Sequence, residues 1–306
     1  MALSLSEKSA LIKQEALRLG FDCCGIAPAG DVGEEHERVS QWLTEGNHAE
    51  MGYMANHFDK RCNLTLLVEG AKSVIVFAHN YFPQEKQPPH LPQVSYYAYG
   101  KDYHEVIKQK LFALMEFIHR DIEPVEGRAF VDSAPVLERY WAKRAGLGWI
   151  GKNNLLIIPG KGSFFFLSEL ILNIELAYDE PYTESHCGKC TRCANACPTG
   201  ALSKHKLDAR KCLSYLTIEK KGEFSPEIET LHNRLYGCDI CQQVCPWNRF
   251  AQPHQTPEFL PSSDFLQYDL AKWQSLTEED FRQHFRHSPI KRTGFVGIQR
   301  NAGKIL

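Results

Sequence analysis

The sequence predicts an α+β protein, with an α/β domain at residues 1–177, a cysteine-rich unit at 178–250 and a short basic helical tail at 251–306. Alternating helix and strand patterns through the first unit are typical of a layered α/β core. The composition changes at Tyr178–Tyr182, and cysteine and basic residues dominate the unit that follows. The final stretch, from 281 to 306, carries six basic side chains and no acidic one.

The composition describes an ordinary globular protein and excludes several classes. The chain has 306 residues, of which 43% are hydrophobic and 24% charged, and its formal net charge of -2 gives no global basic field. No apolar stretch reaches the roughly eighteen residues that span a bilayer, and the N-terminus lacks the pattern of a signal peptide. We therefore expect a cytoplasmic protein without membrane association, in which eleven cysteines indicate metal binding rather than disulfides.

The first predicted elements are a helix, a strand and a loop. The helix runs from Ser6 to Leu19, with Gly20 in its C-terminal capping position. The apolar run Lys72–Ala78 predicts a buried strand. Four prolines in Pro83–Pro92 predict a loop.

The second half of this domain predicts another helix, a strand and a hairpin. Apolar residues recur at helical spacing from Ile107 to Ile122. The short strand Arg128–Val131 precedes a helix that Ser133 would cap, with Pro135 in its first turn. The segment Leu155–Leu167, with a glycine-rich turn at its centre, predicts a β-hairpin.

A run of four closely spaced cysteines ends in Cys-Pro. The spacing Cys-x2-Cys-x2-Cys-x3-Cys-Pro is that of bacterial ferredoxins, in which the fourth cysteine binds a second cluster. Zinc would more usually take two separated pairs of ligands. The run therefore predicts an iron–sulfur centre at Cys187, Cys190, Cys193 and Cys197.

A second run supplies the remaining ligands. Cys238-x2-Cys241-x3-Cys245-Pro246 repeats the end of the first run, but Leu235 stands where a fourth cysteine is expected. Cys212 can fold back to replace it. Crossed ligation then gives one [4Fe–4S] cluster the ligands Cys187, Cys190, Cys193 and Cys245 and the other the ligands Cys197, Cys212, Cys238 and Cys241. We interpret Cys23, Cys24 and Cys62, which show no ligand spacing, as small buried hydrophobic residues.

The cysteine spacing alone leaves three classes of protein open. One is a reductase with a further cofactor, because clusters carry single electrons and add no substrate chemistry. The second is a ferredoxin-type electron carrier with a docking domain. The third is a nucleic-acid protein that uses the clusters structurally.

A series of short motifs stands in order along nearly the whole chain. They are Tyr99–His104, Asp132-Ser133, Glu138-Arg139, Ala145–Asn153, Gly162-Ser163, Arg234–Asp239 and Gln299–Asn301. Together they resemble the epoxyqueuosine reductase family, and more distantly the layout is similar to that of the reductive dehalogenases. The resemblance implies a cobalamin-binding first domain, a ferredoxin-like domain with two [4Fe–4S] clusters and reduction of epoxyqueuosine to queuosine at the wobble position of tRNA, the final step of queuosine biosynthesis.

One departure concerns the tRNA contact surface. Longer members of this family continue into C-terminal helical repeats, whereas this sequence stops at residue 306, as a short form or as a truncated chain. The chemistry implied by the resemblance is unaffected. It uses cob(I)alamin, fed with electrons by the two clusters, and a proton for the opening oxygen.

Asp132 is the predicted proton donor, because it follows a predicted strand and belongs to the family motif. Burial against a corrin would raise its pKa, and a nearby helix N-terminus would lower it. The structural alternative is a plain helix cap. Arg139 is a candidate partner of substrate or of Asp132, or else a surface arginine.

The resemblance also implies cobalamin contacts from Arg61, Asp132, Leu156, Leu167, Ser214, Cys238 and Asp239. The sequence has no Asp-x-His-x-x-Gly run, so we expect cobalamin to be bound with its lower base detached. His79, His104 and His119 are then structural or substrate-facing residues rather than metal ligands.

A tRNA substrate needs phosphate neutralisation, and we predict that Lys220, Lys221, Arg292 and Arg300 contact the anticodon stem-loop. We expect a monomer that receives electrons from a donor of unknown identity. The alternatives are a reductive-dehalogenase-like enzyme with a small-molecule substrate and the ferredoxin-type carrier. The missing export signal and the basic tail favour the tRNA enzyme over the former, and the large first domain argues against the latter.

Overall fold

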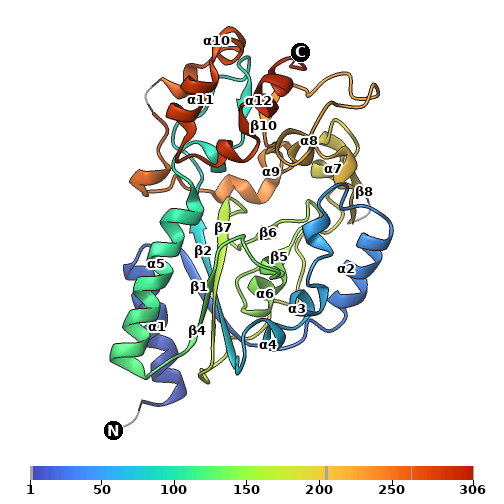
Figure 1. Cartoon of the computed structure of the whole chain (residues 1–306). Helices are drawn as coiled ribbons and strands as arrows, with labels where there is room; N and C mark the ends of the chain where they lie inside the picture. Colours follow the sequence, from blue (N-terminus) through green and yellow to red (C-terminus); the bar gives the residue numbers. More distant parts are fainter. Residues whose placement is uncertain (1–2, 204–205, 263, 306) are drawn as a thin grey trace.

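The computed structural model describes residues 3–203, 206–262 and 264–305. Its centre is a four-stranded antiparallel sheet in the order β1-β2-β7-β4 (Figure 1). The sheet and its flanking helices confirm the predicted α+β class. The four strands are β1 (Cys23–Pro28), β2 (Ser73–Asn80), β7 (Phe165–Leu172) and β4 (Gly127–Phe130).

Helices cover both faces of this sheet. On one face, α1 (Leu5–Arg18) and α5 (Tyr103–Phe117) lie side by side (Figure 1). On the other, α6 (Glu138–Arg144) packs against β2 and β7, with α3 (Phe58–Cys62) and α4 (Leu64–Leu67) on the same side (Figure 1). Because both faces are covered, the two central strands are buried along almost their whole length.

Alternate residues of β7 enter different cores, because successive side chains of a strand point to opposite faces. Phe166 and Leu170 enter the core beneath α1 and α5. Leu167 and Ile171 enter the core beneath α6. Glu169 lies in the same alternation as Leu167 and Ile171, so its side chain is directed toward the face that α6 covers.

The rest of the chain forms short elements. β5 pairs with β6 and β8 with β9, both antiparallel, and β10 pairs with β3 in parallel. These strands are β3 (Gln93–Val94), β5 (Trp149–Ile150), β6 (Leu156–Ile157), β8 (Leu202–Ser203), β9 (Lys206–Leu207) and β10 (Arg234–Tyr236). The remaining helices are α2 (Glu35–Thr44), α7 (Arg192–Ala196), α8 (Leu213–Ile218), α9 (Ile240–Gln243), α10 (Leu270–Ser275), α11 (Glu278–Phe285) and α12 (Gly294–Ala302).

A further core joins segments from all three predicted units. It contains Tyr96 from the first unit, Leu235 from the second and Trp273 from the tail. Leu235, which stands in place of a fourth cysteine, is fully buried there. The unit boundaries at 177 and 250 stay a prediction, and the tail helices pack on the same interior as the elements around them (Figure 1).

Most of the predicted elements are present. The first helix starts one residue early, where Ser4 caps it in a capping box, and it ends before Gly20, which has a φ of +88°. The predicted second helix is α5, and it continues through a single π-helical turn at Ile118–Ile122. Cys62 is buried as expected, whereas Cys23 and Cys24 are only partly buried and pack against the edges of the two cores.

Two sequence-based predictions are wrong, the helix start at Ser133 and Pro135 and the full hairpin at 155–167. Ser133 caps no helix, because α6 begins only at Glu138 with Leu137 at its N-cap. The chain bends at Asp132, whose φ is +44° and whose backbone N–H donates to Glu138 Oε1 at 2.8 Å, so residues 131–137 form an irregular loop instead of a helical turn.

The predicted hairpin at 155–167 forms only at its tip. The Ile158 N–H donates to the Gly162 carbonyl at 2.8 Å. Beyond this turn the two arms separate, because β6 pairs with β5 while β7 enters the central sheet between β2 and β4. Burial of the long apolar run of β7 on both faces explains this outcome. In the part of the chain that the structure describes, no helix combines the length and apolarity needed to cross a membrane.

Candidate functional site

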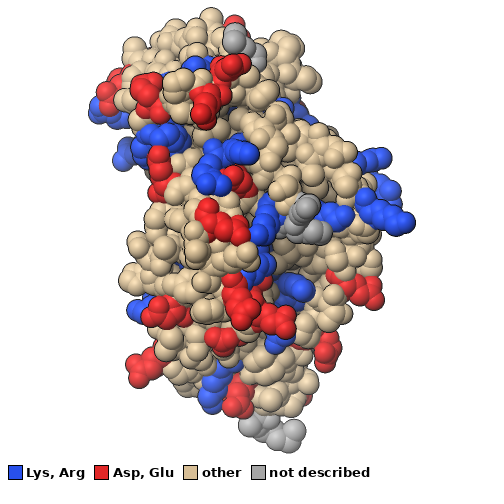
Figure 2. Space-filling view, turned by 90° about the vertical axis from the view of Figure 1, so that its right-hand side faces the viewer, with Lys and Arg blue, Asp and Glu red and all other residues tan. Residues whose placement is uncertain are grey.

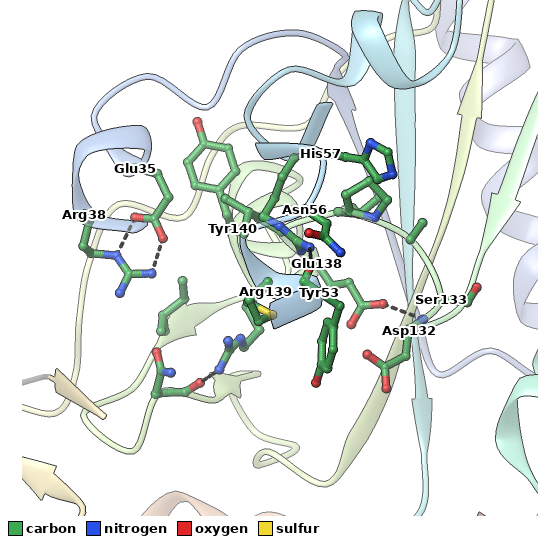
Figure 3. A pocket seen from close by; sticks show the side chains of 18 of the residues that line it. Glu35, Arg38, Tyr53, Asn56, His57, Asp132, Ser133, Glu138, Arg139 and Tyr140 are labelled. Atoms are coloured by element: carbon green, nitrogen blue, oxygen red, sulfur yellow. Dashed lines mark hydrogen bonds and ion pairs between the residues drawn. The ribbon is translucent and has the colours of Figure 1, made fainter. Parts of the chain in front are cut away.

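Asp132 lies two residues after the end of β4, in the loop that leads to α6. Its Oδ2 accepts a hydrogen bond from the Tyr103 hydroxyl at 2.6 Å, although the two residues are 29 apart in the sequence. Its backbone N–H is held by Glu138 (Figure 3). Aspartate tolerates the left-handed conformation better than most residues, and such outliers cluster at functional sites. The loop thus presents an exposed carboxyl that is oriented by contacts on both sides.

Two further carboxyl groups lie close behind Asp132. Glu138 is the first residue of α6, and burial followed by repulsion from Asp132 raises its pKa to about 8. Glu169 pairs in register with Phe130, two residues before Asp132, and both of its carboxyl oxygens are buried without a partner among the described residues. Burial raises the pKa of Glu169 well above its ordinary value, and so does repulsion from Glu138 and Asp132. Both glutamates therefore favour the neutral acid at pH 7.

Three neighbouring cavities surround this group. The Tyr103 cavity, of about 670 Å³, is lined by residues that include Tyr103, Asp132 and Glu138. The Arg61 cavity, of about 440 Å³, also reaches Asp132 and Glu138 (Figure 3). The Cys241 cavity, of about 270 Å³, shares Leu155 with the Tyr103 cavity.

Arg139 lines all three cavities. Its guanidinium donates to the Asn154 carbonyl, which fixes the side chain beside Asp132 and Glu138 (Figure 3). Burial lowers the pKa of Arg139, yet a guanidinium remains charged at neutral pH. It is therefore a cation at the junction of the cavities rather than a surface arginine.

The predicted cobalamin contacts are distributed over these three cavities. Arg61 and Asp132 line the Arg61 cavity, and Leu156 and Leu167 line the Tyr103 cavity with Asp132. The Cys241 cavity is lined by Ser214, Cys238 and Asp239. The assignment of these residues to cobalamin stays a prediction.

Arg61 and Asp239 show what this region can hold. Arg61 is 6% exposed and donates to the Tyr53 carbonyl at 2.9 Å, but its Nε is buried without a partner among the described residues. A buried guanidinium with an unused donor suits a ligand that is rich in hydrogen-bond acceptors. A large cofactor with amide and phosphate groups is such a ligand. The Asp239 carboxylate accepts from the Tyr96 N–H at 2.8 Å, and burial raises its pKa to about 6.

The predicted cluster ligands gather in two groups. Burial raises the pKa of Cys245, and so does repulsion from three neighbouring thiols, those of Cys187, Cys193 and Cys190. In the second group, the thiol of Cys212 has that of Cys197 as a neighbour. Burial likewise raises the pKa of Cys241, with further repulsion from Cys238, Cys212 and, across the two groups, Cys193.

All eleven cysteines lie in the described part of the chain and all are free thiols. Within that part, no group of three or more Cys, His, Asp or Glu side chains closes round a single metal ion. Lys152 Nζ donates to the carbonyls of Gly188 and Cys190, at 2.6 and 3.0 Å, and ties the first cysteine loop to the first domain.

The four predicted tRNA contacts lie near one another. Lys220 pairs with Glu50 at 2.5 Å, and Arg292 pairs with Glu219 at 2.8 Å and lines both cavities that contain Asp132. Lys221 donates to the Arg292 carbonyl at 3.4 Å. On the face shown in Figure 2, basic and acidic side chains are interspersed rather than separated into fields of one sign.

Arg300 has a structural role that the sequence did not indicate. It donates to the backbone carbonyls of Lys220, Gly222 and Leu216, at 2.7, 2.8 and 3.1 Å. Its guanidinium also lies over the Phe224 ring, at 4.2 Å. It therefore holds the segment that carries two of the other basic residues.

The three histidines that the sequence analysis considered lie in different surroundings. His79 is 2% exposed, lies 3.0 Å from the Thr256 hydroxyl and has its pKa lowered to about 3 by burial. His119 bonds the backbone at Val125. Only His104 lines the Tyr103 cavity, with its Nδ1 2.7 Å from Asp102.

The sequence analysis did not assign roles to Tyr103, Glu169 or Lys291. Tyr103 lies inside a motif that was recognised, but its contact with Asp132 depends on the fold. Glu169 is a single acid in the apolar strand Phe165–Leu172, which is a usable signal of a special site. Lys291 lines the Tyr103 cavity and pairs with Asp102 at 2.8 Å.

Two family models match the chain. Residues 186–248 match the 4Fe-4S double cluster binding domain, and residues 61–133 match the model described as Epoxyqueuosine reductase QueG, DUF1730. The first match shows that the chain carries two [4Fe–4S] clusters.

Curated relatives match over nearly the full length. The epoxyqueuosine reductase of Cellulophaga algicola is 50% identical over 295 residues, which cover 96% of each chain. That of Escherichia coli K12 is 40% identical over 312 residues, which cover 99% of this chain and 82% of the relative.

Solved structures show the same similarity. An epoxyqueuosine reductase bound to a tRNA-Tyr epoxyqueuosine-modified stem loop has a TM-score of 0.88 and 32% identity, covering 98% of this chain and 80% of that one. The Bacillus subtilis enzyme, described with its catalytic aspartate loop swung out of the active site, has a TM-score of 0.86 and 31% identity, covering 98% and 81%. A reductive dehalogenase, with a TM-score of 0.52 and 17% identity over 80% of this chain and 32% of that one, shares the fold. That fold is consistent with cobalamin as a further cofactor.

Proposed function

The chain belongs to the epoxyqueuosine reductase family of oxidoreductases, and from this premise we propose that it reduces epoxyqueuosine to queuosine at the wobble position of tRNA. The observation that carries the proposal is the Tyr103–Asp132 pair, placed where cavities meet beside the cysteine groups. The tRNA stem loop bound by a related enzyme supports the substrate. A tRNA substrate would also agree with the expected cytoplasmic location.

The reaction removes the epoxide oxygen and leaves an alkene. It consumes two electrons and two protons, and the oxygen departs as water. Cobalamin, when bound, supplies a low-potential metal centre that reacts with carbon, while the clusters supply electrons singly. Arg61, Leu156, Leu167, Ser214, Cys238 and Asp239 are the residues that would hold it. The chain's own contribution is to orient the substrate, exclude water and deliver a proton.

Asp132 is the proposed proton donor. The Tyr103 hydroxyl occupies Oδ2, so Oδ1 remains available to a substrate in the Tyr103 cavity. The acids Glu138 and Glu169, whose pKa values are raised by burial, lie behind it and keep the negative charge of the site low. The loop swung out in the Bacillus subtilis structure supports a mobile position for the corresponding aspartate.

Electrons would reach this site from the second cysteine group. Cys197, Cys212, Cys238 and Cys241 all line the Cys241 cavity. That cavity shares Tyr81, Tyr97 and Leu155 with the Tyr103 cavity, so the two are neighbours. The crossed ligand sets, with Cys187, Cys190, Cys193 and Cys245 on the other cluster, are part of this proposal.

The tRNA would lie across the basic residues beside Arg292. Lys220, Lys221 and Arg292 would neutralise phosphates of the anticodon stem-loop, because phosphate contacts supply most sequence-independent affinity. Arg300 would act mainly by holding the Lys220 segment in place. Arg292 lines the same cavities as Asp132. A phosphate bound by Arg292 would therefore bring the stem-loop close to the reacting group.

Anaerobic turnover tests the proposal. The enzyme with reconstituted clusters and cobalamin receives a strong reductant and tRNA bearing epoxyqueuosine, and the nucleosides are analysed by mass spectrometry. We expect the loss of one oxygen, dependent on cobalamin and reduced by a factor of about 10² or more in Asp132→Asn. Asp121→Asn, which alters an exposed carboxylate paired with Arg120, is the control. An unchanged nucleoside with fully loaded cofactors would instead favour a small-molecule substrate, as in the dehalogenases.

A further inference from the structure

A basic hollow of about 1200 Å³ lies on the side of the first cysteine group, away from the three cavities of the site. We call it the Cys245 hollow, because the predicted cluster ligand Cys245 forms part of its wall. It shares no lining residue with the cavities that contain Asp132 or with the Cys241 cavity. Its position is therefore distinct from the substrate site.

The charge of the Cys245 hollow has one sign. Four cations and no carboxylate line it, and the cations are Lys86, Arg192, Arg234 and Arg249. Three of them, Lys86, Arg192 and Arg249, are exposed. Within the described residues none of the four forms an ion pair with a carboxylate, whereas the tail cations Lys291 and Arg292 are both paired.

Aromatic side chains hold two of these cations in place. Lys86 Nζ lies 4.4 Å from the centre of the Phe82 ring, and the Arg249 guanidinium lies 4.6 Å from that of Phe250. Tyr96 forms a further part of the wall and accepts from Gln243 Nε2 at 3.0 Å. The hollow is thus a preorganised cationic surface rather than a fringe of mobile side chains.

The two cysteine groups differ in what they face. The group of Cys197, Cys212, Cys238 and Cys241 faces inward, onto the cavity next to the Tyr103 cavity. From the other group Cys245 lines the Cys245 hollow, and the two groups are neighbours through Cys241 and Cys193. A path for single electrons therefore leads from the hollow to the outer cluster, then to the inner cluster and the site.

We propose that the Cys245 hollow is the docking surface for the electron donor, and that this donor is a small acidic protein with a low-potential one-electron centre. Its complementary charge would steer the encounter, and weak electron-transfer complexes need only a small interface. A nucleic acid would also meet the charge requirement, but a tRNA placed here would lie away from Asp132 and would cover the outer cluster.

Each encounter transfers one electron from the donor to the outer cluster. A donor with an anionic flavin hydroquinone loses one electron and becomes the neutral semiquinone. The outer cluster gains that electron and passes from [4Fe–4S]²⁺ to [4Fe–4S]⁺, and no bond forms or breaks. Two encounters supply the two electrons of one turnover. The use of the two electrons in epoxyqueuosine reduction rests on the proposed function, whereas reduction of the outer cluster by the donor does not.

The test measures cluster reduction without any tRNA. Stopped-flow absorbance gives the second-order rate constant for reduction of the reconstituted enzyme by an acidic flavodoxin hydroquinone. We expect the triple variant Lys86→Gln/Arg192→Gln/Arg249→Gln to lower this constant about tenfold or more at low ionic strength, and to flatten its dependence on salt. Reduction by methyl viologen radical, which needs no docking, should be unchanged.

The matched control is Lys108→Gln/Arg282→Gln/Arg286→Gln, which removes the same charge from α5 and from the region of α11 and leaves the hollow intact. Equal rate constants in the two triple variants would overturn the proposal.

If the first variant loads its clusters poorly, Lys86→Glu alone repeats the test, because Lys86 lies in a loop distant in sequence from every cysteine ligand. A loss of tRNA stem-loop affinity with normal reduction by flavodoxin would also overturn it, and would make the hollow an RNA surface. Failure of epoxyqueuosine turnover would leave these rates unaffected.

Discussion

At the scale of single residues, the contact between Tyr103 and Asp132 decides how the proposed acid is aimed. The phenol donates at 2.6 Å, and the aromatic ring stacks on Phe166 with centroids 4.2 Å apart. A hydroxyl fixed in this way would orient the carboxyl toward a substrate in the Tyr103 cavity. We therefore propose Tyr103 as a positioning residue.

Tyr103→Phe should keep the ring and remove only the hydrogen bond. We expect kcat for epoxyqueuosine reduction to fall about tenfold, the decrease expected for the loss of one hydrogen bond, with KM nearly unchanged. The matched control is Tyr268→Phe, which removes a hydroxyl bonded to Asp264 at 3.2 Å in the tail. A fall in kcat of similar size in both variants would argue against a positioning role.

Glu169 makes stability depend on pH. In the folded chain burial holds its pKa well above the ordinary 4.5, while in the unfolded chain it ionises near 4.5. Its contribution to stability is therefore greatest below pH 4.5 and is lost as the pH rises toward the folded-state pKa. The slope in that window reaches about 1.4 kcal/mol per pH unit.

Glu169→Gln has a neutral side chain at every pH. The melting temperature of this variant, relative to that of the parent chain, should therefore increase as the pH rises from 6 to 8. Anaerobic thermal melts at the two pH values measure this difference. Glu175→Gln, at an exposed glutamate that pairs with Lys72, should show no such trend. A gap between Glu169→Gln and the parent that stays constant with pH would contradict a neutral buried acid.

At the scale of elements, the close approach of β1 to the end of α6 sets the position of the acid loop. A Cβ on Gly25 would lie 2.1 Å from the Ala145 carbonyl oxygen, a distance that backbone atoms cannot accommodate without moving. Because α6 carries Glu138 and Arg139, any displacement of its C-terminal end is transmitted toward Asp132.

Gly25→Ala should therefore destabilise the chain by about 1–3 kcal/mol through overpacking and also lower turnover. Thermal melts and the nucleoside assay measure the two effects. Gly30→Ala is the control, because a Cβ there meets no atom within 4 Å. Equal melting temperatures for the two variants would show that β1 and α6 can separate at little cost.

At the scale of the whole molecule, the basic side chains serve different purposes. Lys221 and Arg292 lie beside the cavities of the site, Arg300 ties backbone segments together, and the cations of the Cys245 hollow lie elsewhere. The net charge of -2 hides this division, since the total says nothing about where each charge lies.

Binding of the tRNA anticodon stem-loop should separate these roles. For Lys221→Gln and Arg292→Gln we expect weaker binding and a salt slope reduced by about one for each phosphate that is no longer neutralised. Fluorescence anisotropy over a range of salt concentrations measures both quantities. Arg300→Gln should lower the melting temperature as well, because three backbone carbonyls lose their donor. Lys108→Gln is the control, and affinities and slopes equal to the control in all three variants would refute the tRNA surface.

Most of the sequence-based predictions rested on patterns within short stretches of sequence. Helical and strand periodicity predicted α1, β2, α5 and β4, because side-chain alternation repeats every few residues along the chain. The hairpin prediction was wrong because pairing of β7 with β2 and β4 depends on segments roughly 40 to 90 residues away in the sequence.

The sequence by itself determined the two-cluster chemistry and the family, and it singled out Asp132 as the candidate acid, because ligand spacing and short motifs are local properties. Only the tertiary structure decided that Tyr103 orients Asp132, that Glu169 lies buried behind it and that Arg139 joins three cavities. It also separated the Cys245 hollow from the substrate side of the molecule. Burial and long-range pairing create these relations, and neither leaves a pattern within a short window of sequence.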